Sequence, residues 1–104
     1  MAESEGEDQV ADATRLMELE TEPLLYPNPN NGQSVFLVQE GLTAPVTEID
    51  VFDGMGRKVY SRSIATEGSI QLELLFDNRL TSGIYMVRVK NGMSIRTTPM
   101  VVAQ

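Results

Sequence analysis

The sequence predicts an all-β fold, an antiparallel β-sandwich of about seven short strands. Apolar and polar residues alternate with a period of two in several short segments, which is the pattern of strands with one buried face. Turn-forming residues separate these segments, and residues 23–104 contain no segment that reads as a helix. Short strands at regular spacing are typical of a sandwich.

The chain divides into an acidic segment, residues 1–22, and a neutral domain, residues 23–104. The first part carries the full net charge of −7, whereas acids and bases balance in the second. We expect the acidic segment to be a disordered linker, because it has few large apolar residues. Val10, Ala13 and Met17 could share one side of a short helix, but a helix of this length is marginal alone.

Composition excludes several kinds of site. The chain has no cysteine and no histidine, so it lacks disulfides, thiolate metal ligands and the commonest general base. An acidic segment beside a neutral domain offers no basic patch for nucleic acid. No apolar run approaches the roughly 20 residues that span a bilayer. The chain does not begin with a signal peptide, so we expect an exported protein to be represented here by a fragment.

The domain is expected to begin with a short strand and a rigid corner. The apolar run 24–26 ends at residues 27–32, where two prolines fix φ and an Asn-Gly pair makes a turn. Residues 35–39 form the first full strand, followed by a loop. The aromatic residues expected in the core are Tyr26, Phe36 and Tyr85.

Residues 46–63 are expected to form a hairpin. A three-residue loop, Gly54-Met55-Gly56, places Val51 opposite Val59 on the buried face. A shift by one residue would mix the two faces. The pairs expected on the outer face are Phe52 with Lys58, Asp50 with Tyr60, and Glu48 with Arg62.

A second hairpin follows the strand at residues 70–74 and the loop at residues 76–79. Its central strand alternates Tyr85, Val87 and Val89 with Met86, Arg88 and Lys90. A three-residue loop, Lys90-Asn91-Gly92, would set Val89 against Met93 and Val87 against Ile95. Residues 100–103 close the chain as a last strand, expected at an edge because Pro99 has no N–H to donate.

Residues for chemistry are few. Glu48 and Asp50 share one strand face, but the expected pairing with Arg62 and Tyr60 favours a solvated sheet face over a catalytic pair. The loops at 28–32 and 53–56 offer oxygen ligands but lack the spacing of a calcium loop. We therefore expect no catalytic residue, no metal and no cofactor.

Exposed apolar residues are more informative. Ile84 and Met86 lie on the face opposite Tyr85, and Phe52 lies on the face opposite Val51. Scattered apolar residues are normal on a surface, but a contiguous patch would be a docking surface.

Four motifs in order resemble the type A C-terminal sorting domain of the type IX secretion system of Bacteroidetes. They are Tyr26-Pro27-Asn28-Pro29 with Gly32, then Asp53 with Gly56, then Leu80 with Gly83-Ile84-Tyr85, and a short apolar last strand. The resemblance covers residues 25–104. It implies an immunoglobulin-like sandwich that serves as the secretion signal of a cargo protein, not an enzyme.

The resemblance also implies partners and a route. The partners are the type IX translocon, an outer-membrane shuttle protein and a sortase, with lipopolysaccharide reached only through the attached cargo and no nucleic acid or small-molecule substrate. The cargo passes through the periplasm to the cell surface or the medium, and residues 1–22 would be the end of the cargo or its linker. The sortase would cleave within the segment Glu18, Leu19, Glu20, Thr21, Glu22 and Pro23.

We expect the recognition signal to be a folded surface made by the C-terminal strands. Its candidate residues are Gly83, Ile84, Tyr85, Met86, Lys90, Asn91, Gly92, Met100, Val101 and Val102. Two features depart from the family pattern: Thr98-Pro99-Met100 stands where many members carry a lysine, and the lead into Leu80 is long. The alternative is an adhesive or carbohydrate-binding sandwich, which would need an aromatic platform that a chain without tryptophan does not suggest.

Overall fold

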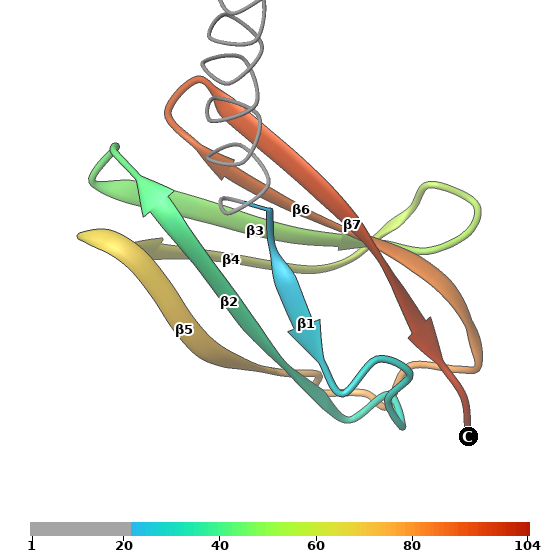
Figure 1. The fold of residues 1–104 in the computed structure, drawn as a ribbon. Coiled ribbons are helices and arrows are strands. Elements are labelled where there is room, and N and C mark those ends of the chain that lie inside the picture. The colour runs from blue at the N-terminus through green and yellow to red at the C-terminus, as the bar shows by residue number, and fades with distance from the viewer. Residues whose placement is uncertain (1–21) are drawn as a thin grey trace, which may run out of the picture.

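The computed structural model describes residues 22–104, which form seven strands (Figure 1). The strands are β1 (Leu24–Tyr26), β2 (Ser34–Leu42), β3 (Val46–Phe52), β4 (Lys58–Ala65), β5 (Gly68–Leu75), β6 (Gly83–Asn91) and β7 (Ser94–Val102). Their order and number confirm the strand prediction.

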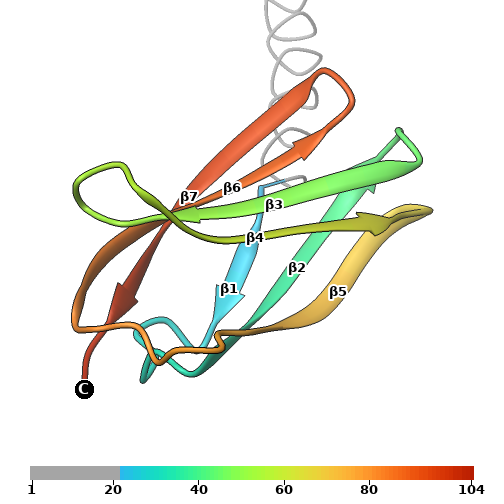
Figure 2. The same cartoon turned by 180° about the vertical axis from the view of Figure 1, so that it is seen from behind.

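The strands form two antiparallel sheets that face each other (Figures 1 and 2). One sheet has the order β1-β2-β5 and the other β4-β3-β6-β7. This confirms the predicted immunoglobulin-like sandwich. Here β4 pairs with β3 in the four-stranded sheet. Within residues 22–104, no helix has the length and apolar character needed to cross a membrane.

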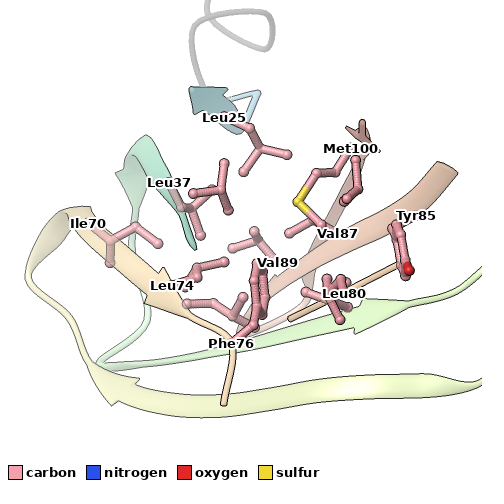
Figure 3. Close-up of a cluster of buried hydrophobic side chains, with 14 of the residues drawn as sticks. Leu25, Leu37, Ile70, Leu74, Phe76, Leu80, Tyr85, Val87, Val89 and Met100 are labelled. Carbon is pink, nitrogen blue, oxygen red and sulfur yellow. The ribbon is translucent and has the colours of Figure 1, made fainter. Parts of the chain in front are cut away.

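Alternate side chains of the strands fill the space between the sheets (Figure 3). The contributing residues are Leu25, Val35, Leu37, Leu42, Ile49, Val51, Ile70, Leu74, Tyr85, Val87, Val89, Met100 and Val102, with Phe76 and Leu80 from the segment between β5 and β6. Each fully buried Val, Leu or Ile contributes about 1.5–3 kcal/mol. Burial of Tyr85 confirms one of the three aromatic core predictions.

The other two aromatic predictions are wrong. Tyr26 is 42% exposed and Phe36 is 39% exposed, and their rings stack on the outer face of the three-stranded sheet at a centroid distance of 5.3 Å. Leu25 and Leu37 pair on the inner face, so their neighbours in sequence must point outward. The run 35–38 has no polar residue to show which side faces water.

The prediction for the first hairpin is right at the turn and wrong beyond it. Phe52 pairs with Lys58 as expected, and the N–H of Asp53 donates to the carbonyl of Arg57 (2.8 Å) across the three-residue loop. A β-bulge then shifts the register, so that Val51 pairs with Tyr60 and Val59 is the extra residue.

The shift changes every later pair of this hairpin. Asp50 lies opposite Ser61, and Glu48 lies opposite Ser63. The predicted pair of Glu48 with Arg62 is therefore wrong. Arg62 instead faces Ile49.

The second hairpin is shorter at its turn than predicted. Asn91 pairs with Ser94, which leaves Gly92 and Met93 as a two-residue loop, with Gly92 at φ +62°. Val89 consequently lies opposite Arg96, not Met93. The reason is Asn91, whose side chain is buried and hydrogen-bonded, so that it is held in the strand.

Candidate functional site

The loop that follows β1 lies against the end of β7 (Figures 1 and 2). Asn28 spans two residues of β7: its Oδ1 accepts from the N–H of Val101 (2.8 Å) and its Nδ2 donates to the carbonyl of Pro99 (3.1 Å). Asn30 continues through its backbone, donating to the carbonyl of Val101 (3.0 Å) and accepting from the N–H of Ala103 (2.9 Å). The two asparagines thus line the outer edge of β7.

Gly32 joins this loop to the segment before β6. Its N–H donates to Oδ1 of Asn30 (2.8 Å), and its carbonyl accepts from the N–H of Leu80 (2.8 Å). Its φ is +86°, and a Cβ here would overlap the carbonyl oxygen of Leu80. The side-chain amide of Gln104 donates to the carbonyl of Leu80. Both conformation and space therefore require glycine at this position.

These contacts change what β7 can offer a partner. It is the outer strand of its sheet, which confirms the predicted edge, and the carbonyl of Pro99 points away from β6 as an edge proline should. Among residues 22–104, however, the backbone from 99 to 103 is already paired with the loop after β1. A partner strand could add there only by displacing that loop.

Five apolar side chains form a continuous group on the outer face of β3, β6 and β7. Phe52 lies beside Met86, and Met86 beside Pro99, in one row across three strands. Ile84, which is 64% exposed, and Val101 form the next row. We call these five residues the four-strand patch, because they lie on the outer face of the four-stranded sheet. The predicted apolar face of Phe52, Ile84 and Met86 is therefore contiguous.

Asp50 lies in the neighbouring row and is only 2% exposed. Ser61 donates to its Oδ1 (2.7 Å), Arg88 to its Oδ2 (2.8 Å), and the Nζ of Lys58 lies 3.5 Å away. Burial raises the pKa of Asp50, but the hydrogen bonds from Ser61 and Arg88 and the charges of Lys58 and Arg88 outweigh it and leave the pKa below its usual value. The prediction of a solvated Asp50 is wrong, because the bulge brings Ser61 opposite it.

Arg88 connects this ion pair to the patch. Its guanidinium lies over the ring of Phe52, 4.9 Å from the ring centre. Arg88 thereby fixes the ring at the border between the polar and apolar rows.

Asp53 organises the loop of the first hairpin. Its Oδ1 accepts from the N–H groups of Met55 and Arg57 (2.9 Å each), and its Oδ2 pairs with Nε of Arg57 (2.9 Å). The hydrogen bond from the backbone of Arg57, followed by that from Met55, holds the pKa of Asp53 below its usual value. Gly56 supplies the positive φ (+84°) that closes the loop. Asp53 and Gly56 are thus turn residues.

Tyr85 is fixed at the start of β6. Its hydroxyl donates to the carbonyl of Thr81 (2.7 Å), four residues upstream, as in the tyrosine corner of immunoglobulin-like domains. Gly83 lies between them with φ +158°, and a Cβ there would meet only Cε1 of Tyr85 at 3.8 Å. Space therefore does not require glycine at this position.

Asn91 is a buried hub. Its Oδ1 accepts from the N–H groups of Thr43 and Ala44, and its Nδ2 donates to the carbonyl of Ala44 and to Oγ1 of Thr47. Thr47 is fully buried. The hub ties the turn after β6 to the loop between β2 and β3.

The predicted recognition residues divide into two groups. Those with exposed side chains or backbone are Gly83, Ile84, Met86, Lys90, Gly92 and Val101, whereas Tyr85, Asn91, Met100 and Val102 are buried. Of the predicted cleavage region, residues 18–21 lie outside the described residues, Glu22 is exposed and Pro23 is buried. Sequence reasoning missed Asn30, and it assigned no role to the outward position of Pro99.

A cleft of about 670 Å³ lies beside β4. Tyr60 and Phe76, whose rings meet edge to face at 5.3 Å, contribute to its wall, and Asp53, Arg57 and Asp77 also line it. In the part of the chain that the structure describes, no group of three or more acidic residues could hold a metal ion.

Comparison with known families identifies a match. The model of the secretion system C-terminal sorting domain matches residues 24–103, which is most of the chain and nearly all of the sandwich. A search of curated proteins found no match. The matched range includes the loop after β1, Leu80, the four-strand patch and β7.

Proposed function

Because the chain belongs to the family of secretion system C-terminal sorting domains, we propose that the secretion machinery recognises it through the four-strand patch. The domain is a sorting signal for type IX secretion and works with that system. Its cargo is exported to the cell surface or secreted. The observation that carries the proposal is the continuity of the patch across β3, β6 and β7, which only the folded sheet provides.

Val101 and Ile84 are the residues of β7 and β6 that a receptor would touch. Both point outward, while Met100 and Val102 hold β7 on the core. Arg88 gives the patch a charged border, and Lys90 lies two residues beyond it on the same face, opposite Glu48. The hydrogen bonds that Asn28 and Asn30 make with β7 support the proposal, because they hold the strand in place and so keep the side chain of Val101 on the outer face.

The finer route is also a proposal. The domain would be met in the periplasm, carried through the translocon with an outer-membrane shuttle protein, and removed by a sortase that cleaves between Glu18 and Pro23. The cargo would then be released or joined to lipopolysaccharide. This position suits cleavage, because it precedes β1 and leaves every strand with the domain.

The domain itself would carry out no chemistry. The chain has no histidine or cysteine, and Asp50, the most buried carboxylate among residues 22–104, is occupied by Ser61, Arg88 and Lys58. A carbohydrate-binding role is not favoured. Tyr26 and Phe36 stack on each other at an interplanar angle of 16°, so one face of each ring is covered by the other ring and is not free to stack on a sugar.

The test is export of a reporter in a type IX-competent host. Residues 1–104 fused behind a periplasmic reporter should bring it to the surface or medium, whereas a peptide of residues 80–104 should not, since it cannot form β3 and lacks Phe52. Equal export by the peptide would contradict recognition of a folded surface. If neither fusion is exported, the proposal that residues 1–104 contain a sufficient export signal is wrong.

A further inference from the structure

The outer face of the three-stranded sheet also carries an apolar group. Tyr26 pairs with Phe36 in one row, Leu24 with Val38 in the next, and Leu75 lies at the end of β5, 61% exposed. We call these residues the three-strand patch, because they lie on the outer face of the three-stranded sheet. The proposed recognition of the four-strand patch leaves this face unused.

The charges around the three-strand patch have one sign. Strands β1, β2 and β5 contain two acids, Glu40 and Glu73, and no lysine or arginine. Glu73 lies opposite Phe36 in the aromatic row, and Glu40 follows Val38 on the same face. Both acids are exposed.

The face around the four-strand patch has the opposite balance. Lys58, Arg88 and Lys90 point outward there, against Glu48 and Asp50. Asp50 is buried under Lys58, which lies beside Phe52 at the border of the patch, and under Arg88 in the next row. Lys90 is exposed one row further on, opposite Glu48. The accessible charge near the apolar rows is therefore positive.

We propose that the three-strand patch of one copy docks on the four-strand patch of a second copy. Both patches lie on outer sheet faces and lose apolar contact with water on docking. Charge selects this arrangement, because Glu40 and Glu73 of one copy would approach the face of the next copy on which Lys58, Arg88 and Lys90 outnumber Glu48 and Asp50. Docking of two three-strand patches would bring acids together. The contact is heterologous, so it propagates from copy to copy.

The docking has a consequence for export. A copy whose four-strand patch is covered by its neighbour cannot present that patch to a receptor. Self-association and recognition would thus exclude each other, but the association does not depend on the recognition proposal.

Sedimentation velocity of residues 1–104 tests the association. The mean mass should rise with concentration up to about 1 mM, a range that reveals weak contacts, and should fall as salt screens the charges. Leu75→Ser should weaken the association by about 5-fold or more, because it removes an exposed apolar residue from the three-strand patch. Met93→Ser is the matched control, since Met93 is fully exposed in the turn after β6 and lies outside both patches.

Charge exchange tests the arrangement. Glu73→Lys and Lys90→Glu should each weaken the association by about 2-fold to 5-fold. An equimolar mixture of the two variants should associate more strongly than either variant alone, because alternating copies of the two pair opposite charges at these positions.

Three outcomes would overturn the proposal. One is a monomer at every concentration. The second is a closed dimer that Lys90→Glu leaves unchanged, which would indicate docking of identical faces. The third is a mixture of the charge variants that associates no better than either alone.

Discussion

Asn28 and Val101 lie 73 residues apart in the sequence and are joined by a 2.8 Å hydrogen bond from the N–H of Val101 to Oδ1 of Asn28. The same carboxamide also donates to Pro99, so one side chain satisfies two backbone groups of β7. The corner after β1 is thus part of the C-terminal edge.

Asn28→Ala should loosen the end of β7 without unfolding the domain. Loss of the two hydrogen bonds should lower the free energy of unfolding by about 1–3 kcal/mol. Hydrogen exchange at the amide of Val101 should accelerate more than exchange at Val87. Asn31→Ala is the control, because Asn31 is exposed and bonds only to Gln33. Equal effects of the two changes would mean that the contact with β7 contributes nothing.

Gly32→Ala should be far more damaging than Gly68→Ala. The two glycines have nearly equal φ, +86° and +84°, so alanine carries a similar backbone penalty of about 1–2 kcal/mol at both. Only at Gly32 would the new Cβ also overlap the carbonyl oxygen of Leu80, since the space beside Gly68 is open. Chemical denaturation measures the difference. Similar losses would show that the loop moves away from Leu80 at little cost.

Asn91→Ala should destabilise the domain by about 2–4 kcal/mol, because it empties a buried site and removes the hydrogen bonds that join it to the loop between β2 and β3 and to Thr47. The N–H groups of Thr43 and Ala44 lose their acceptor, whereas the hydroxyl of Thr47 loses one donor and keeps its hydrogen bond with Thr66. Thermal unfolding of Asn91→Ala and of the exposed control Asn78→Ala provides the measurement. A loss no larger than in the control would contradict the hub.

Asp50→Asn should change how stability depends on pH. The pKa of Asp50 is lower in the folded protein than its usual 3.8, so the contribution of its charge is complete above that value and is lost as pH falls through the folded pKa. The unchanged chain should therefore be more stable than the variant between about pH 5 and 7, and the difference should shrink below about pH 4. A difference that does not vary with pH would show that the charge of Asp50 is not stabilising.

The strands, the sandwich and the position of the four-strand patch could be predicted because period-two alternation records which side chains point together. Ile84 and Met86 were placed correctly on this basis. Phe36 was not, because the run 35–38 is apolar on both faces.

Register and long-range contacts could not be predicted in the same way. The bulge at Val59 leaves no mark in composition, yet it moves Asp50 from the side of Tyr60 to that of Ser61. The capping of β7 by Asn28 depends on how the two sheets are placed, which local pattern does not determine.

Export of the Ile84→Asp variant tests recognition of the folded four-strand patch most directly. Ile84 is 64% exposed, so the variant should stay folded, and Met93→Asp serves as the control on a fully exposed residue outside the patch. Reporter fused to Ile84→Asp should reach the surface or medium on the order of 10-fold less efficiently than reporter fused to the control. Export of a folded Ile84→Asp variant at the control level would contradict the account.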